Sequence, residues 1–326
     1  MSLLEVRDLH VWFDLSDGGQ LHAVQGLSFD VDTGERIGLV GESGCGKTTT
    51  VLAILGLLPP SASVAGDVRF EGESILSGGE ETVQSRRWKD IAMVFQGAMN
   101  ALNPVKTVEA QIIEPMELHG TAEGAAARKI AGELLEMVGI PAVAGSRYPH
   151  EFSGGMRQRA ALAMALACGP KVLLADEPTT ALDVMVQAQI LQVLTGLARD
   201  LGLALVLVTH DLPVVAQVCE RAAVMYAGEI VEVGAMEELF HAPCHPYTRL
   251  LFAATPDLYG EEDVASIPGA PPRLDREIVG CPFRERCDRA FDRCGRERPG
   301  LLPLGDGRAA ACHLNDEPVD AGFRSR

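Results

Sequence analysis

The apolar residues of the first forty positions recur at every second residue, which is the spacing of a β-strand with one buried face. Two such stretches, 3–13 and 23–41, are separated by glycine and aspartate turns. The second stretch ends in a nearly continuous apolar run, as a parallel strand buried on both faces does. The spacing then becomes helical over 47–58, and Pro59 and Pro60 are expected to stop this helix.

Apolar runs in the middle of the chain alternate between strand and helix spacing. Between 107 and 168 the spacing is helical and alanine-rich, and a long amphipathic helix is predicted from 184 to Gly202. This alternation predicts an α/β fold with buried strands. The strands are expected at 67–76, 90–96, 171–178 and 204–211, and in a hairpin over 222–234 that turns at Ala227 and Gly228.

The pattern of strands and helices fades after about residue 240. One short helix is predicted at the start of this tail, followed by a proline-rich extended stretch at 267–274. We therefore expect two parts in the chain. Residues 1–240 would form one domain, with a helical subdomain at about 97–168, and residues 241–326 would form a C-terminal extension that bears four cysteines.

The net charge of −17 narrows the choice of partners, since nucleic-acid-binding proteins usually carry a basic face. We therefore expect no nucleic acid partner. No apolar run approaches the ~18 residues that a membrane-spanning helix needs, and the first residues lack the basic start and apolar stretch of a signal peptide. The sequence predicts a soluble, cytosolic chain, in which disulfides are uncommon.

The segment Gly41–Thr48, GESGCGKT, lies between a predicted strand and a predicted helix. Glycines at this spacing let backbone N–H groups turn toward phosphate oxygens, and the start of the helix adds partial positive charge. Lys47 would reach the β- and γ-phosphates, and the Thr48 hydroxyl would hold Mg²⁺. The segment predicts a phosphate-binding loop for a nucleoside triphosphate.

Two acidic residues, Asp176 and Glu177, follow the apolar run of the strand predicted at 171–178. Asp176 at the strand end can hold a water of Mg²⁺, and Glu177 can orient or deprotonate the water that attacks the γ-phosphate. Acids after a strand are also common in solvated turns, so this interpretation depends on the phosphate-binding loop. The two segments together predict an NTPase.

Ser153, Gly154 and Gly155 open a strongly helical stretch. Ser153 suits the N-cap position, and the two glycines leave backbone N–H groups open to an anion. A single nucleotide has no obvious need for two such helix starts, so a plain helix cap is the alternative interpretation.

The segment SGGMRQR, followed by the segment LLADEPTTALD, resembles the corresponding motifs of the ATP-binding subunits of ABC proteins. The resemblance covers about residues 1–240. It implies a P-loop ATPase with a RecA-like core, an N-terminal antiparallel β subdomain and an α-helical subdomain. In this family two chains pair head to tail, and ATP lies between the phosphate-binding loop of one chain and the Ser-Gly-Gly helix of the other. The implied activity is ATP hydrolysis coupled to transport.

The resemblance assigns catalytic roles position by position. Glu177 matches the residue that activates water, Gln96 the glutamine that links Mg²⁺ and water to the membrane partner, and His210 the switch histidine near the γ-phosphate. Mg²⁺ ligation is implied for Thr48, Gln96 and Asp176. Contacts with the partner chain's ATP are implied for Ser153, Gly154, Gly155 and Asp183.

Three positions around the ATP site leave a choice of interpretation. Phe13 aligns with the aromatic that stacks on adenine, although Trp12 beside it is an alternative. Met156 stands where the family usually has glutamine, so a polar contact is absent there. Cys45 is either an oxidation-sensitive thiol or a small residue that fits the loop, and we favour the second. ATP contacts are implied for Phe13, Gly41, Ser43, Gly44, Cys45, Gly46, Lys47, Thr48 and Thr49.

Four stretches of the tail, HPYTRLLFAATP, IPGAPPRL, GCPFRERCDRAFDRC and ACH, resemble the C-terminal extension of ATPases that serve dipeptide, oligopeptide and nickel importers. The segment FQGAMNALNPVKTV fits the same branch. The implied function is to power import of peptides across the cytoplasmic membrane. Nickel import is an alternative, and a non-transport ABC ATPase is an alternative of another class.

This branch also implies partners and a location. The partners are a second ABC ATPase subunit, more often a different chain than a second copy, two transmembrane permease subunits, and a separate substrate-binding protein. We therefore expect the chain to lie peripherally on the cytoplasmic face of the inner membrane.

The four tail cysteines are separated by five, six and seventeen residues, without the close pair that is usual in structural zinc sites. Four thiolates can bind zinc or an iron–sulfur cluster, and six arginines from 284 to 298 would offset the charge of a cluster. The spacing leaves both open, and the family resemblance implies a [4Fe–4S] cluster with zinc as the second choice. We expect it to pin the tail and, being remote in sequence from the ATP motifs, to have no role in hydrolysis. The cysteines are Cys281, Cys287, Cys294 and Cys312.

Overall fold

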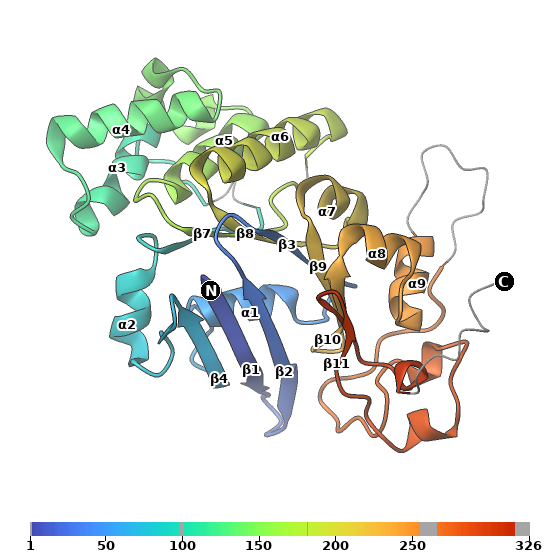
Figure 1. The fold of residues 1–326 in the computed structure, drawn as a ribbon. Coiled ribbons are helices and arrows are strands. Elements are labelled where there is room, and N and C mark those ends of the chain that lie inside the picture. The colour runs from blue at the N-terminus through green and yellow to red at the C-terminus, as the bar shows by residue number, and fades with distance from the viewer. Residues whose placement is uncertain (1, 98–100, 181, 255–265, 317–326) are drawn as a thin grey trace. The chain divides into compact units, whose positions relative to one another are not determined.

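The computed structural model describes residues 2–97, 101–180, 182–254 and 266–316. Part of the branch-specific segment (98–100), the residue before Leu182 and the end of the extension therefore lie outside the described residues. The chain, drawn in Figure 1, divides into two compact units. The first unit contains Met1–Glu5, Asp30–Arg36 and Arg69–Val208, and the second contains Val6–Phe29, Ile37–Val68 and Thr209–Arg326.

The first unit contains three parallel strands, β6 (Ile91–Val94), β7 (Val172–Asp176) and β8 (Ala204–Thr209). β7 lies between the other two, and all five of its residues are buried. A strand covered on both faces needs apolar residues at every position rather than at every second one. This explains why the sequence of β7 reads as a continuous apolar run that ends in an acid.

The helices α3, α4 and α5 of the first unit pack against one another, and α6 packs on α5 (Figure 1). Side chains close three of the helix starts: Thr107 caps α3, Ser153 caps α5 and Asp183 caps α6. α6 ends as predicted at Gly202, which adopts the left-handed conformation. The helices of this unit are α2 (Gly79–Arg86), α3 (Val108–Leu118), α4 (Gly124–Met137), α5 (Gly154–Ala165) and α6 (Val184–Leu201).

Two sheets build most of the second unit. β1 (Leu4–Asp14) lies between β2 (Gln20–Val31) and β4 (Ala62–Phe70), and the short loop from β1 to β2 makes these two strands antiparallel. A further short strand, β5 (Glu73–Ser74), pairs antiparallel with the end of β4 and lies in the first unit. The N-terminal strands predicted from the period-two pattern are therefore present, and β1 and β2 are antiparallel as the family resemblance implies.

The other sheet of the second unit contains the predicted hairpin. β3 (Arg36–Val40) runs parallel to β9 (Arg221–Tyr226), and β9 pairs antiparallel with β10 (Glu229–Ala235) through the expected turn at 227–228. Two strands of the extension, β12 (Arg308–Ala310) and β11 (Leu302–Gly305), continue this sheet beyond β10. The extension is thus part of the sheet whose strand β3 leads into the segment Gly41–Thr48.

The helices of the second unit are α1 (Lys47–Ile54), α7 (Leu212–Val218), α8 (Met236–His241) and α9 (Pro246–Ala253). α1 ends before the prolines that were expected to stop it. Gly56 adopts a left-handed conformation, and the Leu57 N–H donates to the Leu52 carbonyl at 2.8 Å, which closes the helix in a Schellman motif. The prediction of the helix end was wrong because Gly56 ends the helix before the chain reaches Pro59.

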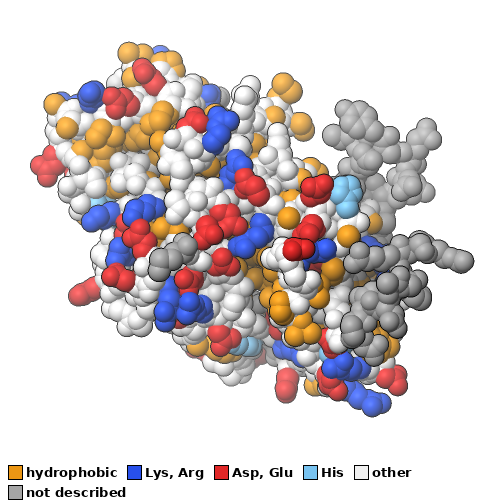
Figure 2. Space-filling model, in the orientation of Figure 1, with side chains coloured by type: hydrophobic (Ala, Val, Ile, Leu, Met, Phe, Trp, Pro, Cys, Tyr) orange, Lys and Arg blue, Asp and Glu red, His pale blue; other side chains and the backbone are white. Residues whose placement is uncertain are grey.

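Two further observations concern the charges on the surface and the apolar character of the helices. On the face shown in Figure 2, acidic and basic side chains are interspersed rather than gathered into one basic field. None of the helices in the described ranges combines the length and the apolar character needed to cross a bilayer.

Candidate nucleotide-binding site

The phosphate-binding loop, Gly41–Thr48, follows β3 in the second unit and has a backbone that only glycine can supply. Gly41, Gly44 and Gly46 have φ angles of 152°, 82° and 105°. A Cβ on Gly41 would lie 2.2 Å from the Met225 carbonyl oxygen, and one on Gly46 would lie 2.7 Å from the Ala23 carbonyl oxygen. The loop is therefore held close to neighbouring backbone, and α1 begins within it, at Lys47.

Lys47 is buried at the end of this loop. Its Nζ donates to the carbonyl oxygens of Gly41, at 2.7 Å, and Glu42, at 3.0 Å. These contacts keep the ammonium group over the loop, where it can reach phosphate oxygens. Thr48 and Ser43 are exposed, and Thr49 is half-buried.

Cys45 lies under the loop rather than at its surface, since only 5% of it is exposed. Burial raises the pKa of its thiol, and its carbonyl oxygen accepts a hydrogen bond from the Gly228 N–H at 3.0 Å. A buried, protonated thiol is a poor target for oxidation. The structure therefore favours Cys45 as a small residue that fits the loop.

The structure brings Gln96 and Glu177 together in the first unit. The Gln96 amide donates to Glu177 Oε2 at 2.9 Å, and the Thr180 hydroxyl donates to the same oxygen at 2.8 Å. Glu177 has a φ of 43°, and its N–H is fixed by the Val208 carbonyl at 2.8 Å. Such a strained conformation in a non-glycine residue is common at functional sites. Asp176, one residue earlier, is buried at the end of β7.

Ser153 caps α5 as predicted, by accepting a hydrogen bond from the Met156 N–H at 3.3 Å. Gly155 is required by packing as well, because a Cβ there would lie 2.6 Å from Val186 Cγ1 on α6. Asp183 caps that same α6 through the Val186 N–H at 3.0 Å. Ser153 and Asp183 thus also cap α5 and α6, and Gly155 allows the two helices to pack closely.

We predict that Gly155→Ala lowers the free energy of unfolding by about 1–3 kcal/mol, the usual effect of overpacking. The matched control is Gly196→Ala on α6, where no atom lies within 4 Å of the added Cβ. That substitution should stabilise the helix by about 0.5–1 kcal/mol. Urea denaturation measures both, and equal shifts for the two variants would contradict the packing explanation.

His210 and the N-terminal aromatic residues belong to the second unit. His210 is exposed where β8 ends. Trp12 stacks on His22, with ring centroids 4.6 Å apart, and on His10, at 5.3 Å. Neighbouring strand residues point to opposite faces, so Phe13 lies on the other face of β1. Because the Trp12 ring is engaged with two histidines, the geometry favours Phe13 as the aromatic for adenine.

Glu42 is a residue of the loop that the sequence did not single out. Its carboxylate accepts two hydrogen bonds from Arg286 in the extension, at 2.6 and 2.9 Å, and its N–H donates to the Tyr247 hydroxyl at 2.9 Å. An acid within the loop and a tyrosine after His245-Pro246 were visible, but nothing in the sequence links them. The extension therefore contacts the phosphate-binding loop, although the two are far apart in the sequence.

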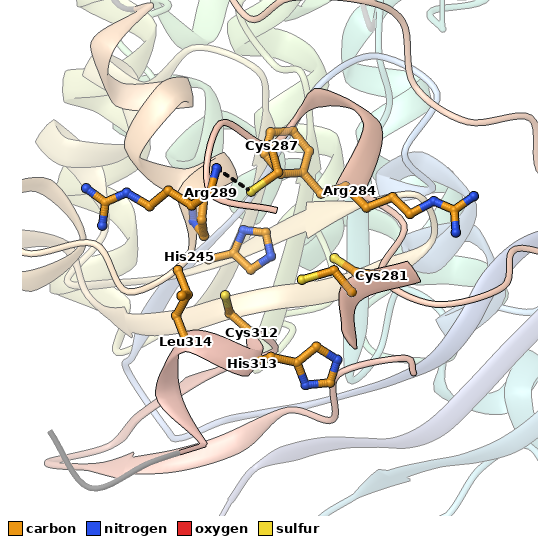
Figure 3. A pocket seen from close by; sticks show the side chains of 11 residues that line it. His245, Cys281, Arg284, Cys287, Arg289, Cys312, His313 and Leu314 are labelled. Carbon is orange, nitrogen blue, oxygen red and sulfur yellow. Dashed lines mark hydrogen bonds between the residues drawn. The ribbon is translucent and has the colours of Figure 1, made fainter. Parts of the chain in front are cut away.

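The four tail cysteines line one small cavity in the second unit, together with His245 and His313 (Figure 3). The four tail cysteines are thiols that form no disulfide. Burial raises the pKa of Cys281 and of Cys312 to about 11. Over the described part of the chain, no three His, Cys, Asp or Glu side chains are grouped to hold one metal ion. The four cysteines line a common cavity, but among the described residues they are not arranged as a metal site, so a cluster at this place is not confirmed.

Similarity to known proteins identifies the class of protein to which this chain belongs. Residues 24–180 match the ABC transporter family, and residues 231–294 match the family described as oligopeptide/dipeptide transporter, C-terminal region. The ATP-binding cassette MJ0796, solved as a dimer in a post-hydrolysis state with ADP and Pi, aligns with a TM-score of 0.63 and 28% identity over 72% of this chain and 98% of that chain. The fold is that of an ABC ATPase, as predicted.

Full-length relatives narrow the assignment. The probable peptide ABC transporter ATP-binding protein y4tR of Sinorhizobium fredii is 46% identical over 98% of this chain and 96% of its own. The oligopeptide transport ATP-binding protein OppD of Escherichia coli is 44% identical over 95% of this chain and 93% of its own. The chain belongs to the family of ATP-binding proteins of peptide ABC transporters.

Proposed function

We propose that this chain binds and hydrolyses ATP to power the import of dipeptides or oligopeptides through an ABC transporter. One observation carries the proposal: the similarity to peptide transport ATP-binding proteins runs through the extension as well as the ATPase core. The dipeptide transport ATP-binding protein DppD of Bacillus subtilis, for example, is 46% identical over 98% of this chain. The core alone would leave the transported substrate open.

The residues of the two units have separate tasks in this proposal. Lys47 and the N–H groups of the loop bind the phosphates of ATP, and Phe13 stacks on the adenine. Glu177 takes up the proton of the attacking water, held in place by Gln96 and Thr180. His210 contacts the γ-phosphate. Thr48, Gln96 and Asp176 would hold Mg²⁺, which offsets the charge on the phosphates.

A second ATPase subunit completes each site in the proposed assembly. Ser153, Gly154 and Gly155 at the start of α5 would face the ATP bound by that subunit, with Asp183 at the dimer interface. We propose a related, non-identical chain as this partner, because the branch commonly uses two different ATPases. Two transmembrane permease subunits and a separate substrate-binding protein complete the importer. The chain would then lie on the cytoplasmic face of the inner membrane.

Transport of labelled peptides tests the function directly. Cells that carry the Glu177→Gln form of this chain in place of the native form should lose uptake of di- or oligopeptides, and the native form should restore it. Unchanged peptide uptake together with a fall in nickel accumulation would point to the nickel alternative. Association of the purified chain with nucleic acid, and not with permease subunits, would contradict a transport role.

We further propose that Cys281, Cys287, Cys294 and Cys312 hold a [4Fe–4S] cluster that fixes the extension. The donor chemistry fits, because four thiol sulfurs share one cavity and cysteine is the usual ligand of such clusters. We expect anaerobically purified protein to be brown and to lose its visible absorbance in Cys287→Ser, whereas Cys168→Ser should keep it. Colourless protein with one equivalent of zinc would contradict the iron assignment.

A further inference from the structure

An ion pair connects the extension directly to the phosphate-binding loop. Arg286 donates from both terminal nitrogens to the two carboxylate oxygens of Glu42, the second residue of the loop. The same Glu42 offers its carbonyl oxygen to the Lys47 ammonium at 3.0 Å. Contacts therefore connect Arg286 through Glu42 to Lys47, the lysine that is proposed to bind the phosphates.

Arg286 is held rigidly on its own side of this contact. Its side chain is only 4% exposed, and its Nε donates to the Pro268 carbonyl at 2.7 Å. The guanidinium lies over the rings of Tyr226 and Phe283, at 5.7 and 5.9 Å from their centroids. A bidentate pair in such surroundings is strong and fixed in geometry. Removing one partner alone would leave the other charge largely out of water.

The position of Arg286 depends on the cysteine-bearing turn. It is the residue before Cys287, and the tight turn from Cys281 to Cys287 is closed by backbone hydrogen bonds from Arg284 to Cys281 and from Arg286 to Phe283, at 3.2 and 3.0 Å. Phe283 is buried against Tyr226 and Tyr247. The turn that carries two of the cavity's cysteines thus also aims the arginine at the loop.

We propose that Arg286 is a positioning residue for ATP binding: through Glu42 it holds the phosphate-binding loop, and it offsets a carboxylate that would otherwise repel the phosphates. The inference rests on the proposed function, because it requires that the loop binds ATP. It gives the extension a task in nucleotide binding in addition to its own folding.

The test measures the affinity of the intact purified chain for a fluorescent ATP analogue with Mg²⁺, and kcat and KM for ATP. We expect Arg286→Met to weaken binding about tenfold, within the range typical of coupling between sites, with KM affected more than kcat. Adding Glu42→Gln to this variant removes the unpaired carboxylate and should restore the part of the affinity that was lost to charge repulsion, though not the part that depends on the ion pair. A role of Arg286 confined to the fold of the extension would not be relieved by a change in the loop.

Controls separate this inference from the function on which it rests. Arg249→Gln breaks the ion pair with Asp288, at 2.6 Å, which lies in the same extension but does not touch the loop, so affinity should not change. If Arg286→Met does not fold, Arg286→Gln takes its place, since it keeps a donor without the charge. Native affinity in the Arg286 variant, or no rescue by Glu42→Gln, would overturn the proposal. A native chain that does not bind ATP would instead overturn the proposed function.

Discussion

Glu177→Gln is expected to lower the turnover of ATP by about 10²- to 10⁴-fold, the usual contribution of a positioned general base. The glutamine has nearly the same shape and can keep its contacts with Gln96 and Thr180, but it cannot take up a proton from water. Because Glu177 is not among the groups that hold the phosphates, ATP should remain bound. Phosphate release and retention of labelled ATP on filters measure the two effects separately.

Glu133→Gln on α4 is the matched control for this substitution. Glu133 is 56% exposed and forms only a loose surface pair with Lys129. The variant should hydrolyse ATP at the native rate, because the same change from glutamate to glutamine is made at a residue that has no assigned role in ATP binding or hydrolysis. Native turnover in Glu177→Gln would remove Glu177 as the general base and leave another group to activate the water.

The second large effect is expected from Lys47→Ala, which should weaken ATP binding by about 10- to 100-fold. This range corresponds to the loss of a hydrogen bond to a charged group, about 1.5–3 kcal/mol. The ammonium is buried and fixed by two carbonyl oxygens of the loop, and the loop GESGCGKT contains no second cationic residue that could take its place. Titration with a fluorescent ATP analogue gives the dissociation constant.

Lys129→Ala serves as the control, because its side chain is 79% exposed on α4. The thermal midpoints of both variants should be recorded as well, since Lys47 also binds its own loop. Unchanged ATP affinity in a folded Lys47→Ala protein would mean that the phosphates bind elsewhere.

The features that the sequence predicts well are those that neighbouring residues determine. β7 is recognisable because burial on both faces requires an unbroken apolar run, and Asp176 and Glu177 follow at its end. The turn at Gly228 and the end of α6 at Gly202 follow from the left-handed backbone that glycine permits, whereas Ala227 has a φ of 51° without that freedom. The ATP motifs are recognisable for the same reason, because each of them consists of residues that are adjacent in the sequence.

The features that the sequence missed depend on contacts across long separations. Glu42 and Arg286 are 244 positions apart, and either residue alone reads as an ordinary surface charge. The stacking of Trp12 on His22 depends on how β1 and β2 are aligned in their sheet. The gathering of the four cysteines around one cavity was expected from the family, whereas their link to the loop required the fold.

The two short strands of the extension also protect the rest of the protein from self-association. β12 covers the open edge of β10, and β11, which contains Pro303, becomes the outer strand instead. A short edge strand with proline is a poor template for pairing with another chain. A shortened protein ending near residue 240 would bare the edge of β10 and leave the buried Glu232 without its partners at Cys244 and His245. Such a fragment would keep every ATP motif and yet be expected to precipitate on storage.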